Sequence, residues 1–319
     1  MKNKRFVTKV FAAAFVFASL FITSCASSGN GEKAKLVEED SRLFWRIDGT
    51  DKNGNPSSIY IQGTFHLADE QSYPISEQVV SVFKNADRVY GELASDDWPA
   101  VQNKVVTLMT QSYKEGRDIL DYLTEEEQAK LITLFQGEKN LEPYKAYEPW
   151  VINSSVTAAI YLVTGLDAQS GIDNWLESTN LEMGRKTLGL DDLQTQLNLV
   201  RYGDYNTQLA FLKGTLSEYP FVDTIDQLVQ MYQAYLEDDR AGLEKLLNGD
   251  TEENLETIPV SIYEKYYKDM ILNRNTKWAK TFKKLLKEGG TTFVFAGSAH
   301  FLGPDSVFEI MKSQGVLDF

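Results

Sequence analysis

Short apolar runs rich in β-branched and aromatic residues alternate with amphipathic stretches near both ends of the chain. Runs at 43–47 and 59–61 flank a cluster of Asp, Gly, Asn and Pro, which predicts a hairpin with a long loop. Other short runs predict single strands at 88–93, 187–190, 291–296 and 316–319. Helical spacing of apolar residues fills most of the sequence between them. This arrangement predicts an α/β or α+β fold, in which helices flank a central mixed sheet.

The middle of the chain has a helical pattern with little strand signal. Residues 98–165 predict a large helical insertion, in which Thr124-Glu-Glu-Glu127 has the sequence of a capping box. Further helices are predicted over about 192–287. Gly303-Pro304-Asp305 predicts the start of one more helix. We therefore expect residues 41–319 to form a single domain.

The first 24 residues have the pattern of a lipoprotein signal peptide. Four basic residues precede an apolar segment, 10–22, which is too short to cross a bilayer as a helix. Ile22-Thr-Ser-Cys25 looks like a bacterial lipobox, so we expect Cys25, the only cysteine, to be lipidated. Residues 25–40 are rich in Ser, Gly, Glu and Lys, which predicts a flexible tether.

This N-terminus has consequences for location and partners. The predicted protein is extracytoplasmic, is attached to a bacterial membrane by its lipid and contains no disulfide. Its net charge of −14 becomes more negative when the basic signal is removed. We therefore expect no nucleic-acid binding and repulsion from anionic lipid headgroups, whereas basic peptides or metal cations are better electrostatic partners.

The chain contains only two histidines, and each follows a predicted strand in a Gly-x-x-His motif, Gly63-Thr-Phe-His66 and Gly297-Ser-Ala-His300. A glycine at the first position lets the chain turn sharply off a strand without a Cβ clash. Glu92 and Asp191 also lie near the ends of predicted strands. Ligands in open α/β sheets bind beyond the carboxyl ends of the strands, so we expect these four side chains to converge.

Two imidazoles with one or two carboxylates can hold a divalent metal ion. Two His and one Glu leave an open position for water on Zn²⁺, and a facial arrangement also suits Mn²⁺, Co²⁺ or Fe²⁺. Such a metal lowers the pKa of its bound water and polarises a substrate carbonyl.

Each of these residues also has a plainer interpretation. A histidine after a strand often serves only as a hydrogen-bonding residue, and Glu92 can be an ordinary surface carboxylate. Asp191-Asp192 can cap the next helix. Spacing alone places Arg274-Asn275 on the solvated face of an amphipathic helix.

Taken in order, these motifs resemble the TraB/GumN (TraB/PrgY) family over nearly the whole mature chain. The matching segments are Gly63-Thr-Phe-His66-Leu67, Glu92-Leu93, Gly171-Ile-Asp173, Gly189-Leu190 with Gln196 downstream, Arg274-Asn275 with Trp278-Ala279, and Gly297-Ser-Ala-His300-Phe-Leu-Gly303-Pro-Asp-Ser306-Val307. The resemblance implies a distant relation to the Tiki metalloproteases and to the erythromycin-esterase and ChaN-like group. It also implies their fold, a central mixed sheet with helical insertions.

The resemblance further implies which residues act. By position, His66, His300 and Glu92 become metal ligands, with Mn²⁺ or Co²⁺ favoured. Arg274 and Asn275 would line the site and hold a substrate carbonyl or carboxylate. We therefore predict Glu92, Arg274 and Asn275 as catalytic residues. Asp191 is the fourth predicted ligand, although the family usually has Leu-Glu where this chain has Leu190-Asp191, and aspartate reaches less far.

Two main hypotheses follow from the residues and the resemblance. The first is a lipid-anchored, metal-dependent hydrolase that acts on peptide bonds in a peptide or protein substrate, with Mn²⁺, Co²⁺ or Zn²⁺ as cofactor. The second is a binding protein that sequesters a peptide signal, or binds haem through His66 or His300, without turnover. A structural lipoprotein with a vestigial site is a third.

Overall fold

The computed structural model describes residues 33–248 and 258–318 of the chain. The predicted signal peptide and Cys25 lie outside the described residues. Over the part of the chain that is described, no helix is long and apolar enough to cross a bilayer.

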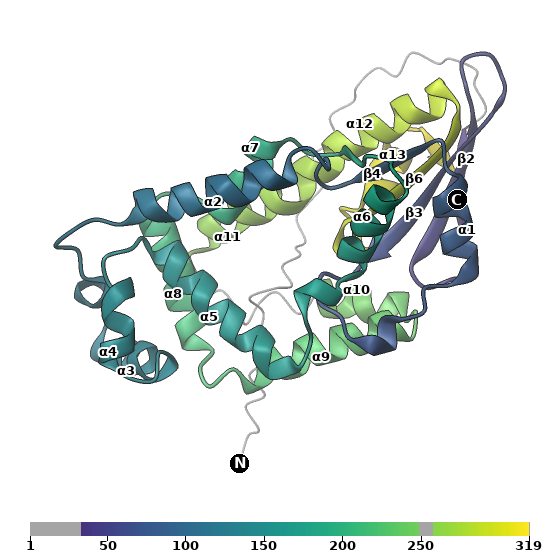
Figure 1. The fold of residues 1–319 in the computed structure, drawn as a ribbon. Helices are drawn as coiled ribbons and strands as arrows, with labels where there is room; N and C mark the ends of the chain where they lie inside the picture. The colour runs from purple at the N-terminus through teal and green to yellow at the C-terminus, as the bar shows by residue number, and fades with distance from the viewer. Residues whose placement is uncertain (1–32, 249–257, 319) are drawn as a thin grey trace.

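A mixed seven-stranded sheet forms the centre of the fold, in the order β5-β4-β6-β3-β2-β1-β7 (Figure 1). Neighbours among β5, β4, β6 and β3 are parallel, so the carboxyl ends of these strands meet at one edge. β2 is antiparallel to both β3 and β1, and β7 is parallel to β1. This sheet with its helices confirms the predicted fold class. The strands are β1 (Ala34–Glu38), β2 (Phe44–Thr50), β3 (Pro56–Thr64), β4 (Arg88–Gly91), β5 (Leu188–Gly189), β6 (Gly290–Gly297) and β7 (Leu317–Asp318).

The pairing of β3 with β6 places the two Gly-x-x-His motifs side by side. Thr64 lies opposite Gly297 in the parallel register, so the chain leaves both strands at nearly the same level. The hydroxyl of Ser298 donates a hydrogen bond of 2.8 Å to the Thr64 carbonyl and ties the two turns together. The predicted hairpin is also confirmed, because β2 and β3 pair up to Thr50 and Pro56.

The prediction of a flexible tether over 25–40 is wrong for its last part. Residues Ala34–Glu38 form β1, which lies between β2 and β7. Ala34 is buried, and its N–H donates to the Val316 carbonyl at 3.0 Å. Two neighbouring strands supply backbone partners to this segment, so it forms a strand despite its polar composition.

Aromatic side chains pack on both faces of the sheet. Phe44 and Trp45 are adjacent in β2 and therefore point to opposite faces. Phe44 contacts Phe293, which in turn contacts Phe83 of α1 (Glu77–Asn85). Trp45 contacts Phe308 of α13 (Val307–Ser313). The predicted start of this helix at 303–305 is wrong by a few residues, because the Ser306 hydroxyl caps it.

The helices predicted within 98–165 and 192–287 are present (Figure 1). Several of them enclose a second apolar cluster, separate from the core around the sheet. This cluster includes Leu131, Ile152 and Leu212, which are buried on three different helices. Thr124 and Glu127 form the predicted capping box. The helices are α2 (Trp98–Ser112), α3 (Glu125–Leu134), α4 (Glu138–Leu141), α5 (Pro149–Thr164), α7 (Leu193–Val200), α8 (Tyr205–Ser217), α9 (Val222–Leu236), α10 (Arg240–Asn248) and α11 (Val260–Tyr267).

Candidate functional site

Four of the predicted site residues come from the carboxyl edge of the parallel strands. His66 and Glu92 follow β3 and β4, and Asp191 follows β5. His300 ends a short 3₁₀ turn, Ser298–His300, directly after β6. Because these strands are neighbours, residues far apart in the sequence meet here, as the strand pattern predicts.

Arg274 and Asn275 also reach this edge, from the first turn of α12 (Asn273–Glu288). A π-helical turn, Lys268–Leu272, runs directly into this helix. Arg274 is 5% exposed and Asn275 is fully buried, so their interpretation as a solvated face is wrong. The same face carries Trp278, and the helix packs it against the sheet. The family resemblance implies that Arg274 and Asn275 line the site, and the structure places both side chains there.

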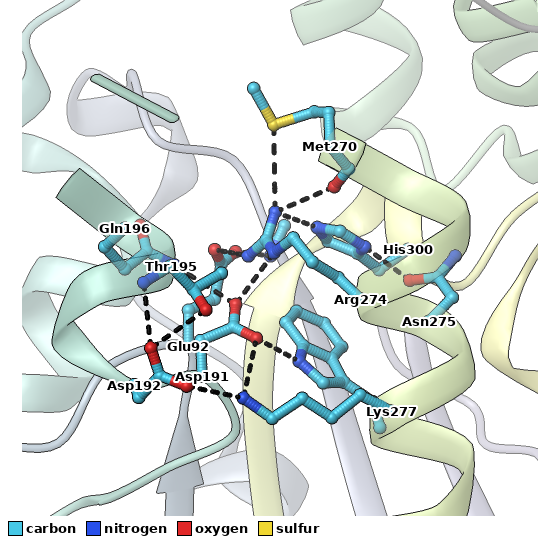
Figure 2. A network of polar contacts seen from close by, with 12 residues as sticks. Glu92, Asp191, Asp192, Thr195, Gln196, Met270, Arg274, Asn275, Lys277 and His300 are labelled. Atoms are coloured by element: carbon cyan, nitrogen blue, oxygen red, sulfur yellow. Dashed lines mark hydrogen bonds and ion pairs between the residues drawn. The ribbon is translucent and has the colours of Figure 1, made fainter. Parts of the chain in front are cut away.

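The guanidinium of Arg274 lies at the centre of the site and contacts Asp191, Glu92 and His300 (Figure 2). It donates to Asp191 Oδ2 at 2.7 Å, to Glu92 Oε2 at 2.5 Å and to the Met270 carbonyl at 3.1 Å. Another N–H points at Nε2 of His300, 3.0 Å away. The fork of donors on arginine suits two carboxylates at once, and both charges are compensated in a buried place.

Asp191 is occupied by protein donors on both of its oxygens. Besides Arg274, Oδ2 accepts from Gln196 at 3.2 Å, and Oδ1 accepts from the Trp278 indole at 3.0 Å. The geometry therefore gives Asp191 the role of holding Arg274 and Trp278, not of presenting a free oxygen to a metal. The neighbouring Asp192 caps α7, so the capping interpretation holds for the second aspartate of the pair.

Asn275 fixes the ring of His300. The amide nitrogen of Asn275 donates to the Asp305 carbonyl at 2.7 Å, which leaves its oxygen to accept from Nδ1 of His300 at 2.6 Å. Nε2 of His300 is then the acceptor that faces Arg274. Burial, together with the charge of Arg274, lowers the pKa of His300 to about 3, so the ring is neutral at neutral pH.

Glu92 and His66 face each other at the outer side of the cluster. Nε2 of His66 lies 3.8 Å from Glu92 Oε1, which also accepts from the Gly297 N–H at 3.0 Å. Desolvation favours the neutral acid, but Arg274 above all holds the pKa of Glu92 well below its usual range. Glu92 is therefore ionised at neutral pH.

Asp173 is a site residue that the sequence reasoning missed. It lies in the first turn of α6 (Ile172–Glu182), with Oδ1 at 3.2 Å from Nδ1 of His66. Desolvation lowers the pKa of His66, but the nearby carboxylate of Asp173 above all, with that of Glu92, outweighs it and raises the pKa to about 9. The sequence signal for this residue is the Gly171-Ile-Asp173 motif, which lies at the start of a helix.

The predicted ligands fit a divalent cation only in part. His66 Nε2 and Glu92 Oε1 have a separation close to that of two ligands on one ion, whose bonds are each about 2.1 Å long. His300 offers Nε2, but an Arg274 N–H occupies it. Among the described residues, no three His, Cys, Asp or Glu side chains already form a metal-binding group. A metal held by His66, Glu92 and His300 requires Arg274 to release His300.

An open pocket of about 310 Å³ reaches the site from the side of α7 and the π-helical turn. Its lining residues include Arg274 and Asp191 of the site, together with Asn273 and Lys277. Its size is at the lower limit for pockets that hold small ligands. A ligand in this pocket has access to the guanidinium.

These features define the class of protein. It is an α/β protein whose mixed sheet presents, at its carboxyl edge, a buried arginine between carboxylates and histidines. The sequence model of the TraB/PrgY/gumN family matches residues 43–317, and the chain belongs to this family.

One relative has a similar length. An uncharacterized protein of Treponema pallidum (strain Nichols) is 27% identical over 301 residues, which cover 93% of this chain and 88% of that protein. No solved structure matches the chain significantly. The family is therefore established by sequence.

Proposed function

We propose that the protein is an extracytoplasmic, metal-dependent hydrolase of peptide bonds, anchored to a bacterial membrane through lipidated Cys25. One observation carries the hydrolase proposal, namely that the ends of adjacent parallel strands place His66, Glu92 and His300 around Arg274. The anchor proposal rests on the lipobox sequence before Cys25. A divalent ion such as Mn²⁺, Co²⁺ or Zn²⁺, held by His66, Glu92 and His300, would supply an activated water and polarise the scissile carbonyl.

The side chains around these ligands have separate roles. Asn275 keeps the His300 tautomer in which Nε2 is an acceptor, as a metal ligand must be. Asp173 faces His66, with Oδ1 at 3.2 Å from Nδ1, and its charge favours a proton on that nitrogen. The guanidinium of Arg274 is fixed by Asp191, and it can stabilise the negative charge that develops on a substrate oxygen.

Calorimetric titration of the chain in detergent with Mn²⁺, Co²⁺ and Zn²⁺ tests the metal. We expect stoichiometric binding that is lost in the His66→Ala/His300→Ala double variant.

Hydrolysis of a peptide mixture, followed by mass spectrometry, should depend on the same metal and on Glu92. Glu148 is a matched control, because it pairs with Arg201 outside the site. Glu148→Gln should keep both metal binding and peptide hydrolysis. Circular dichroism verifies that the variants fold. Metal binding that persists in the double variant would contradict the proposal.

A second candidate is a protein that binds a peptide without cleaving it. It is favoured by the Arg274 contact with His300 and by the pocket that reaches the guanidinium, because both suit the capture of a carboxylate. In this case peptides should bind without metal and remain intact, and Arg274→Gln should weaken binding. A Soret band on addition of haem, lost in the histidine variants, would instead indicate haem binding.

A further inference from the structure

The carboxyl-terminal half of α12 carries a lysine-rich face at the opposite end of the sheet from the site. Lys280, Lys283, Lys284 and Lys287 are exposed on this helix, and exposed Lys52 joins them from the β2–β3 loop. The N–H of Lys52 donates to the Lys287 carbonyl at 3.1 Å, which fixes the loop beside the helix end (Figure 1). These five lysines surround an open hollow of about 480 Å³, with Glu288 as its one acidic lining residue.

The nearby carboxylates do not neutralise this lysine face. Glu288 binds Arg88 at 2.9 Å and lies 3.5 Å from Lys284. Asp51 accepts hydrogen bonds from the N–H groups of Asn53 and Asn55. Within the described parts of the chain, the other four lysines of the face form no ion pair. The face is therefore strongly positive, although the whole chain has a net charge of −14.

The first described residues begin at the lysine face. β1 is antiparallel to β2, with Lys35 opposite Asp48, so β1 starts next to the β2–β3 loop. A methyl group placed on Gly49 would lie 3.4 Å from Leu286 and 3.5 Å from Ala34. Ala34 is thus close to Leu286, the residue before Lys287. Cys25 precedes Ala34 by only nine residues, which span at most roughly 30 Å when fully extended.

We propose that the lysine face docks on the anionic headgroups of the membrane that holds the lipid anchor. This inference rests on the proposed lipidation of Cys25, which keeps the face within reach of the bilayer. The net charge alone predicts repulsion from such a surface, but electrostatic attraction acts within a Debye length of about 8 Å and depends on the local charge.

This docking sets the orientation of the site. α12 has 16 residues and is roughly 24 Å long. Its carboxyl-terminal half lies in the lysine face, and its first turn carries Arg274 and Asn275. The site therefore points away from the membrane, toward substrates in the aqueous space.

Lysine acetylation of the reconstituted full-length protein tests the docking. The chain is placed in vesicles of phosphatidylcholine, alone or mixed with phosphatidylglycerol, and each lysine is quantified by mass spectrometry. We expect the five lysines to be protected severalfold in anionic vesicles only, and high salt to remove the protection. Lys139 of α4 and Lys114, which follows α2, are exposed and lie outside the lysine face, so they serve as controls. Figure 1 shows α4 far from α12. Equal labelling of the face in both vesicles would overturn the proposal.

A charge variant separates the docking from the anchor. In the unlipidated Cys25→Ser chain, affinity for anionic vesicles should fall roughly fivefold for each lysine removed in Lys280→Gln/Lys283→Gln/Lys287→Gln. Lys114→Gln/Lys139→Gln should leave it unchanged. Equal affinity of the triple variant and the parent would reject the lysine face. Fractionation of cells tests the anchor by itself, because a high-salt wash should release the Cys25→Ser chain from membranes but not the lipidated parent. Metal binding at the distant site is unaffected by either result.

Discussion

At the scale of single residues, the two histidines differ because different groups face them. His300 is 4% exposed and lies against the guanidinium of Arg274, which disfavours a second positive charge. The His66 side chain is 61% exposed and lies between Asp173 and Glu92. The negative charges of these two carboxylates favour the protonated, positively charged ring. The same residue type, delivered by the same four-residue motif, is therefore neutral in one place and charged in the other.

The charge of His66 predicts a pH dependence for the metal-free chain. Its folded pKa of about 9 exceeds the usual value of 6.5, so its stabilising contribution is complete below 6.5 and is lost as the pH rises through 9. Solvent weakens the effect at an exposed ring. In NMR titrations, which show only two histidines, Asp173→Asn should lower the pKa of His66 and flatten the loss of stability between these pH values. The control variant Glu115→Gln, at an exposed position, should change neither the pKa of His66 nor the pH dependence of stability. An unchanged His66 titration in Asp173→Asn would show that Asp173 does not raise the pKa of His66.

Asp191 predicts a large effect on stability. Asp191→Ala removes the partner of Arg274 and Trp278 and leaves the arginine with less compensation in a buried place. Breaking such a pair destabilises a fold by about 3–5 kcal/mol. The adjacent Asp192 is 65% exposed and caps α7, so Asp192→Ala should lower stability by only about 1 kcal/mol. Urea unfolding of both variants measures the difference, and similar losses would show that Asp191 is not a structural anchor.

At the scale of elements, the start of α6 positions His66. The Ile172 N–H donates to the Phe65 carbonyl at 3.3 Å, and Gly171 packs directly on the backbone of His66. A Cβ on Gly171 would lie 2.5 Å from the His66 carbonyl oxygen, which is closer than real contacts allow. The φ angle of Gly171 is −57°, which any residue can adopt without strain. Glycine is therefore required by the close approach to His66 and not by its backbone conformation.

Gly171→Ala should therefore displace the turn that carries His66. We expect reduced thermal stability and a shifted His66 NMR signal, while the His300 signal changes little. Gly49→Ala is a matched control in β2, because its added methyl group meets only ordinary contacts at 3.4 Å or more. If both variants behave alike, the contact between α6 and the His66 turn does not determine the site.

At the scale of the whole molecule, α12 joins two regions of different chemistry. Its first turn belongs to the buried arginine site, and its last turns form part of the lysine face. The apolar side of the helix packs on β2 and β3 between these ends. A single rigid element therefore fixes the direction of the site relative to the proposed membrane surface.

The local pattern of the sequence predicted most of the fold. The runs that became β2, β3, β4 and β6, the helical blocks and the capping box were all visible, because burial repeats every two or 3.6 residues along one element. The β1 strand was missed because its partners, not its composition, make it a strand. The two Gly-x-x-His motifs and the turn after β4 also predicted that His66, Glu92 and His300 share one edge.

Only the tertiary structure decided how these residues are partnered. Arg274 is separated by 182 residues from Glu92 and by 83 from Asp191, and spacing along a helix cannot report such partners. Asp173 likewise meets His66 only because α6 packs against the turn after β3. The sequence by itself determined which elements form and which edge holds the polar residues, since those depend on local periodicity. The charge of each histidine and the placement of the arginine depend on contacts between distant elements, and the tertiary structure alone sets them.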